Sequence, residues 1–383
     1  MAYDYLQQNV IPVKLCKEIG RIGERVVKLN PKDEDRAMGL HRDSIVIDFH
    51  LHDTVMPEDL KDFETLARSG RPAVGYEGIK KSGLTGFLCG FGGSMGRRSS
   101  PTPWQLSDII WDLGIRQADL DHHPEVGIRG YSAKDIRKAK ETGKTAIIPH
   151  VENAQMIDND LDRVDMLYGL GLRCLGLSYN SRTTVADGCT ERTDGGLSNF
   201  GFKVIERMNR LGMLIDLSHS SDIAAKETIE ASQAPCALTH TFARALFDNP
   251  RGKSDDLLKL LAERGGVIGV AAVANLMSGK EVQTVFDVID QVDYLVKLVG
   301  VDHVAIGTDA MFGDHVGMHK LMRGVMDMMK ALKDLPAPYV EYIENPSEWP
   351  NLTRALVARG YSDEAIKKII GGNVLRLLER TIG

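Results

Sequence analysis

Short apolar segments alternate with amphipathic segments along most of the chain, and this alternation constrains the fold more than any other feature of the sequence. Strands that alternate with helices form βαβ units, in which the strands are parallel. The expected strands are Ser44–Asp48, Thr85–Phe91, Thr145–Pro149, Cys174–Leu177, Met213–Leu217, Pro235–Thr239, Gly266–Val270 and His303–Gly307. The expected helices lie near residues 103–118, 133–142, 158–170, 198–211, 221–232, 254–264 and 285–298.

Eight such units fit either a closed (β/α)₈ barrel or a doubly wound open sheet. Polar residues recur at nearly every strand end, which is typical of a barrel and less usual in an open sheet. We therefore predict a single (β/α)₈ barrel domain over residues 1–383. Residues 1–43 would form an N-terminal helical extension, and residues 310–383 a long loop followed by C-terminal helices packed on the barrel.

Two long segments break the regular alternation and are candidate active-site loops, residues 66–103 and residues 310–352. The first contains the segment GFGGSMG, which superficially resembles a phosphate-binding loop. Its glycines at 90, 92, 93 and 96 miss the spacing of a dinucleotide-binding motif, so we interpret it as a flexible loop.

Composition excludes several classes of function. The formal net charge of −6 comes without a basic stripe, so nucleic acid is not an expected partner. The first residues lack a signal-peptide pattern, and no run of about 18 apolar residues occurs, so we expect a cytoplasmic protein without a membrane anchor. The five cysteines show no CxxC spacing and are interpreted as inert thiols.

Side chains that can bind a metal follow five of the expected strands. His50 and His52 are two residues apart on one strand, so both can reach the same ion, with Asp48 behind them. In a barrel the carboxyl ends of all strands meet at one rim. Imidazole and carboxylate groups together suit zinc or a similar divalent ion, with positions left for water and substrate. The predicted metal ligands are His50, His52, Glu152, His219, His240 and Asp309.

The other histidines are weaker candidates. His150 shares a strand face with Glu152, so it could be structural, support a ligand or face the substrate. The remaining ones are interpreted as structural or solvated: His41, His122, His123, His303, His315 and His319.

Several blocks of sequence resemble the membrane (renal) dipeptidase family, especially its soluble bacterial branch. They include SIVIDFHLHD, RCLGLSYNSRTTVADGCTERTDGGLSNFG, GMLIDLSHSS and DHVAIGTD, and their order extends over nearly the whole chain. The resemblance implies a metal-dependent hydrolase of the (β/α)₈ type with two divalent ions, usually zinc. Its substrate would be a dipeptide with a free C-terminal carboxylate, and it could form a homodimer or a higher homo-oligomer.

The resemblance also implies a role for each residue. His50, His52 and Asp309 would bind one ion, and His219 and His240 the other. Glu152 would bridge the two ions, and Arg251 would hold the substrate carboxylate. A hydroxide bridging the ions would attack the amide carbonyl, and Asp309 would carry the proton to the leaving amine.

Three positions depart from the family pattern. His52 stands where the family has aspartate, Tyr179 stands where vertebrate dipeptidases have a histidine that polarises the carbonyl, and Gly252 replaces an asparagine. Tyr179 could contact the substrate and donate a hydrogen bond to an oxyanion, or it could be a packing residue. Alternative activities are hydrolysis of an N-acyl amino acid, a cyclic amide or a lactone, decarboxylation of a small acid, or ligand binding without catalysis.

Overall fold

Parallel strands form the centre of the computed structural model, which describes residues 11–71, 73–93, 96–100, 103–322 and 335–383. Each strand pairs with the next along one continuous path, and all of the predicted strands overlap strands of this sheet. The path runs through β1 (Ile47–Leu51), β4 (Gly86–Gly90), β6 (Thr145–Val151), β7 (Cys174–Gly176), β8 (Leu214–Asp216), β9 (Ala237–Ala243), β11 (Val267–Val270) and β13 (Val304–Ile306).

The sheet curves into a nearly closed barrel, because the first and last strands of the path meet where they end. The backbone N–H of Asp309 donates to the carbonyl of His50 over 2.8 Å, and that of His52 donates to Ala310 over 2.9 Å. Asp48 adds a side-chain link, since it accepts hydrogen bonds from the N–H and the hydroxyl of Thr308. The prediction of a (β/α)₈ barrel is therefore confirmed.

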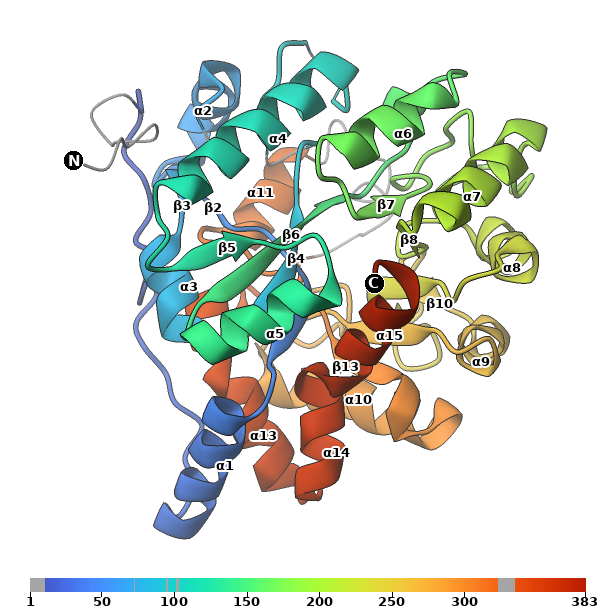
Figure 1. The fold of residues 1–383 in the computed structure, drawn as a ribbon. Helices are drawn as coiled ribbons and strands as arrows, with labels where there is room; N and C mark the ends of the chain where they lie inside the picture. Colours follow the sequence, from blue (N-terminus) through green and yellow to red (C-terminus); the bar gives the residue numbers. More distant parts are fainter. Residues whose placement is uncertain (1–10, 72, 94–95, 101–102, 323–334) are drawn as a thin grey trace.

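Helices surround the barrel, as Figure 1 shows. Several begin after a serine whose side chain accepts a hydrogen bond from the first turn, such as Ser198 and Ser221. The helices between the strands are α4 (Leu106–Asp121), α5 (Ala133–Thr142), α6 (Asp162–Gly169), α7 (Asn199–Leu211), α8 (Asp222–Ala231), α9 (Asp255–Glu263) and α10 (Val285–Val299).

Further elements extend the chain around this centre. Helices are α1 (Pro31–Asp43), α2 (Phe63–Ser69), α3 (Tyr76–Ser82), α11 (His315–Met322), α13 (Pro350–Arg359), α14 (Asp363–Lys367) and α15 (Asn373–Thr381). Short strands are β2 (Thr54–Val55), β3 (Ala73–Val74), β5 (Gly127–Arg129), β10 (Gly252–Lys253), β12 (Gln283–Thr284) and β14 (Val340–Glu341). Within the described residues, no helix is both long enough and apolar enough to span a membrane.

The sequence predicts loops around one strand for residues 66–103, and the structure also has helical segments there. They include α3, which packs against the ring of Phe312 from the segment after β13. A Cβ atom on Gly78 would lie 2.2 Å from that ring, so glycine allows the helix to approach. Residues 94–95 of the glycine-rich segment lie outside the described residues.

The barrel interior is packed with apolar side chains from the strands. Phe49, Leu88 and Ile148 belong to this buried cluster, and Leu375 and Leu378 of α15 pack in the same cluster. A filled interior is usual for barrels of this type, and it leaves the rim formed by the carboxyl ends of the strands for polar residues.

The imidazole of His41 connects α1 to two other parts of the fold. Its Nδ1 lies 2.8 Å from the hydroxyl of Thr353 in α13, and its Nε2 lies 3.0 Å from the carbonyl of Ser82. A neutral ring satisfies both partners, because one nitrogen accepts and the other donates. Burial lowers the pKa of His41 from 6.5 to about 4.

We expect this histidine to make stability depend on pH. Between pH 6.5 and 4 the unfolded chain binds a proton that the folded chain does not, so stability falls as the pH falls through this range, by up to about 3 kcal/mol. Urea unfolding of the wild type and of His41→Gln measures the effect. The advantage of the wild type should shrink from pH 7 to pH 4, and a constant difference would contradict the assignment.

Candidate metal centre

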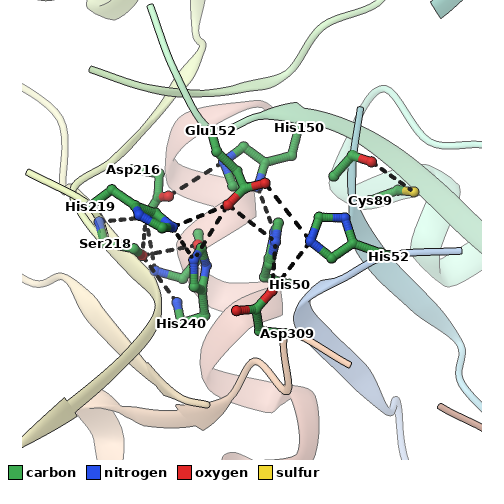
Figure 2. Close-up of polar contacts among 12 residues, drawn as sticks. His50, His52, Cys89, His150, Glu152, Asp216, Ser218, His219, His240 and Asp309 are labelled. Atoms are coloured by element: carbon green, nitrogen blue, oxygen red, sulfur yellow. Dashed lines mark hydrogen bonds and ion pairs between the residues drawn. The ribbon is translucent and has the colours of Figure 1, made fainter. Parts of the chain in front are cut away.

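The predicted ligands lie together at the rim, where the strands end (Figure 2). His50 belongs to β1 and His240 to β9, and the other ligands directly or shortly follow strands β1, β6, β8 and β13. Three overlapping groups have donor atoms within 4.8 Å of one another: His50, His52 and Glu152; His50, His240 and Asp309; and Glu152, His219 and His240.

Glu152 lies at the centre of this arrangement. Its Oε2 is 3.2 Å from Nε2 of His219, 3.6 Å from that of His240 and 3.7 Å from that of His50. Its Oε1 is 3.8 Å from Nε2 of His52. One carboxylate therefore faces both halves of the donor set.

Asp309 provides the second carboxylate. Its Oδ1 lies 3.3 Å from Nε2 of His52 and 3.6 Å from Nε2 of His50. The residue has a φ of 55°, in the left-handed region that a side chain rarely adopts. The hydrogen bond from its own N–H to the carbonyl of His50 holds this conformation and turns the carboxylate toward β1.

Burial and charge leave the cluster suited to a cation. Burial lowers the pKa values of His50, His219 and His240 well below the usual value, so these rings are neutral and can offer a lone pair. Burial also raises the pKa of Glu152 to about 7. It lowers the pKa of His52, but the hydrogen bond to Asp309 and the charge of Glu152 outweigh it and raise that pKa overall.

The ring nitrogen of His50 that faces the carboxylates provides a direct test of fit. Among the described residues, this buried Nε2 has no hydrogen-bond partner, although it points at Glu152 and Asp309. A buried polar atom without a partner is costly unless another group satisfies it. Neutral imidazoles and two carboxylates are donors that divalent ions such as zinc prefer. The residues therefore fit a divalent metal.

Partners behind the ligands decide which ring nitrogen faces the centre. Asn180 Oδ1 lies 2.7 Å from Nδ1 of His219, and Thr239 Oγ1 lies 2.9 Å from Nδ1 of His240. Such contacts orient ligand histidines. The sequence interpretation missed Asn180 and Thr239, because a polar residue beside a strand end carries no signal of which ring it meets.

An irregularity in β1 aims its two histidines at the centre. The pairing of β1 with β4 shifts register between Asp48 and Leu51. Because of this shift, Phe49 packs in the barrel interior and the next residue along the strand, His50, also reaches the site. A bulge re-aims side chains in this way. Gly90 of β4 makes room for the result, since a Cβ there would lie 2.5 Å from the His52 ring.

His150 and Tyr179 take different places around the ligands. His150 is fully buried behind His50, with its Nδ1 2.9 Å from Nδ1 of His50. The ring of Tyr179 stacks on His219 with centroids 4.0 Å apart and lies 5.3 Å from that of Trp104.

Arg251 is buried beside the same segments. Its guanidinium donates hydrogen bonds to the backbone carbonyls of Ser218 and His240, the latter over 3.2 Å. These two contacts use two of its five N–H donors. Its positive charge contributes to the low pKa values of His219 and His240.

Two histidines that the sequence interpretation left aside come close to the cluster. His315 and His319 lie one turn apart on α11, with ring centroids 4.4 Å apart. Burial lowers both pKa values, and the charge of Asp309 opposes that shift in each. Their spacing of four residues soon after the last strand was the available signal, but the path of α11 back toward the rim was not visible in the sequence.

Residues 115–382 match a known family, described as membrane dipeptidase, peptidase family M19. The chain belongs to this family. The matched residues contain Glu152, His219, His240 and Asp309, whereas His50 and His52 precede them.

Other members and solved structures agree with this assignment. Human dipeptidase 3 is 30% identical over 278 residues, which are 70% of this chain and 52% of that protein. Dipeptidase verJ from Clonostachys rogersoniana is 31% identical over 277 residues, 72% of this chain and 64% of that protein. An amidohydrolase from Pseudomonas aeruginosa has a similar structure, with a TM-score of 0.76, 30% identity, and coverage of 90% of this chain and 98% of that one. The chain spans about half the length of the mammalian dipeptidase 3 sequences that it matches.

The contact between Gly90 and the His52 ring generates a prediction. In Gly90→Ala the added methyl group displaces His52, so we expect lower zinc content after incubation with zinc and a loss of stability of about 1–3 kcal/mol. Gly114→Ala in α4 is the control, because a Cβ there meets no described atom within 4 Å. Zinc analysis and thermal unfolding compare the two variants. Wild-type zinc content in Gly90→Ala would contradict the proposed role of the glycine.

Proposed function

We propose that this chain is a metal-dependent dipeptidase that binds two divalent ions, with zinc the first candidate. The observation that carries the proposal is the position of Glu152, which lies 3.2 to 3.8 Å from the Nε2 atoms of four histidines. A single carboxylate shared by two groups of imidazoles suits two neighbouring cations. Membership of the membrane dipeptidase family supports the same reaction.

Divalent ions, when bound here, supply hydroxide at neutral pH and polarise an amide carbonyl. The protein's own groups would position the substrate and move the proton. The carboxylate of Asp309 is the proposed proton carrier, because it lies at the rim beside His50 and His52 and its pKa is low: burial raises that pKa, but the hydrogen bond with His52 outweighs burial. An ionised carboxylate can accept a proton and deliver it to the leaving amine.

Tyr179 is the proposed donor to the substrate carbonyl. Burial raises the pKa of its phenol well above the usual value, so the hydroxyl keeps its proton and can donate. Its ring is fixed by stacking on His219, one of the proposed ligands. This residue would replace the histidine that vertebrate members of the family carry at the position.

Arg251 is the proposed partner of the substrate's C-terminal carboxylate. The two backbone carbonyls that it contacts leave N–H donors for a planar anion, which a guanidinium recognises well. The substrate would then be a small peptide with a free carboxyl end. A dipeptide is the smallest compound that offers this carboxylate, an amide bond and a free amine.

Metal analysis combined with a substrate panel tests the proposal. The chain, incubated with zinc, manganese or cobalt, should hold up to two ions and hydrolyse dipeptides with both termini free faster than amidated or N-acylated analogues. Less than half an ion per chain would overturn the metal assignment. Bound metal with hydrolysis of N-acyl amino acids, cyclic amides or lactones in place of dipeptides would favour another reaction of the same site.

Asp309→Asn separates two roles of this carboxylate. The amide keeps the shape and one oxygen donor but cannot carry a proton. We expect kcat to fall by about 10²–10⁴-fold with KM little changed, in protein that retains its metal. Steady-state kinetics and metal content are measured on the same preparation. Near-normal kcat with metal retained would show that another group carries the proton.

A further inference from the structure

Three fully buried side chains form a line behind the metal centre (Figure 2). Asp216 of β8 has its Oδ2 3.4 Å from Nε2 of His150, and Nδ1 of His150 lies 2.9 Å from Nδ1 of His50. The far nitrogen of His50 points at Glu152 and Asp309. In the sheet order β8 is four places from β1, so His150 of β6 links strands that do not pair with each other.

The Asp216 carboxylate sets the direction of hydrogen bonding along this line. The contact between Asp216 Oδ2 and His150 Nε2 is an ion-pair contact of 3.4 Å, and Nε2 has no hydrogen-bond partner of its own among the described residues. A carboxylate has no proton to donate, so a neutral His150 carries its proton on Nε2, the nitrogen that faces Asp216, and keeps a lone pair on Nδ1. That lone pair can accept only from an N–H at Nδ1 of His50. The Nε2 of His50 is then free of hydrogen and offers its lone pair to the centre.

The partners of the other ligand histidines do not impose a direction so strictly. The hydroxyl of Thr239, beside His240, can either donate or accept, and the amide of Asn180, beside His219, can present oxygen or nitrogen by rotation. Asp216 cannot change in this way. It is also held in place, because its Oδ1 accepts from the N–H and the hydroxyl of Ser218 and from the N–H of Thr239.

We propose that Asp216 and His150 are positioning residues that fix the protonation pattern of His50 for metal binding. The inference rests on the proposed metal-dependent function but concerns residues outside the ligand set. The pair acts only through His50: the carboxylate sets the proton of His150, and His150 sets that of His50. Neither residue needs to contact substrate for this role.

Asp216→Asn tests the direction of this line with little change in shape. The three donors around Oδ1 hold the amide oxygen on that side, so the NH₂ group must face Nε2 of His150. His150 then accepts at Nε2 and carries its proton on Nδ1, which forces His50 to present N–H to the metal. We expect zinc affinity, measured by competition with a chelating dye, to fall by about 10–100-fold.

A second substitution separates this role from the simple loss of a negative charge. In His150→Asn the amide oxygen can stand where Nδ1 of His150 stood and accept from His50 without any link to Asp216. In that background Asp216→Asn should lower zinc affinity by less than about twofold, so the two effects are not additive. Loss of charge alone would lower the affinity in both backgrounds.

Each outcome has a distinct meaning. Wild-type zinc affinity in Asp216→Asn, or equal losses in the two backgrounds, would overturn the positioning role while leaving the metal centre intact. Failure of the wild type to bind zinc would instead contradict the proposed function. Urea unfolding of the metal-free proteins identifies a variant that is misfolded. Asp216→Ser, measured in the same two backgrounds, has no amide to face His150, so where Asp216→Asn folds the effect of Asp216→Ser should be smaller, and an equal or larger effect would also overturn the proposal. Where Asp216→Asn is misfolded, Asp216→Ser alone is used: it should lower zinc affinity with His150 present and not in His150→Asn, and equal losses would overturn the proposal.

Discussion

The buried carboxylate of Glu152 lies among four imidazoles. The other groups at the rim are arranged around this charge. Burial is the main reason that the pKa of Glu152 is raised to about 7, so an ionised Glu152 is costly without nearby positive charge. The rings of His50, His219 and His240 are neutral, and His52 interacts with Asp309 as well as with Glu152. The four rings therefore do not supply the full positive charge that an ionised Glu152 needs. Such a cluster weakens the fold unless a cation joins it, which indicates that these residues are present for chemistry.

Two aspartates connect this costly cluster to the barrel in a similar way. Asp48 of β1 accepts a hydrogen bond from the N–H of His50. It also accepts hydrogen bonds from the N–H and the hydroxyl of Thr308, just after β13, and from the indole N–H of Trp349. Asp216 at the end of β8 accepts from Ser218 and from Thr239 of β9. Each carboxylate thus ties a strand end to a neighbouring strand and holds the segment that carries a ligand. The rigidity of the site comes from these buried hydrogen bonds as much as from the strands.

The sequence predicts the scaffold well and the relations between side chains poorly. The alternation of strands and helices is a local pattern, so the sequence predicts the barrel. The placement of ligands at strand ends is also local, so the sequence predicts that His50, Glu152 and Asp309 lie together. The orientation of His150 toward His50 could not be predicted, because it depends on how β6 and β1 are each registered against β4, which lies between them, and on the irregularity within β1. The approach of α11 to the rim depends on how a long segment returns over the barrel, which no local pattern encodes.

His52 changes the electrostatics of the centre relative to the usual pattern of the family. With an aspartate there, the donor set would carry three negative charges; with His52 it carries two, from Glu152 and Asp309. Fewer negative ligands hold a cation less tightly, since affinity depends on the charge of the ligand set. The same change leaves more positive charge in the loaded site, and the buried guanidinium of Arg251 adds to it. On the proposed function, the substitution would exchange some metal affinity for a stronger attraction of anionic substrate groups. The hydrogen bonds behind the histidines would then matter more for retaining the metal.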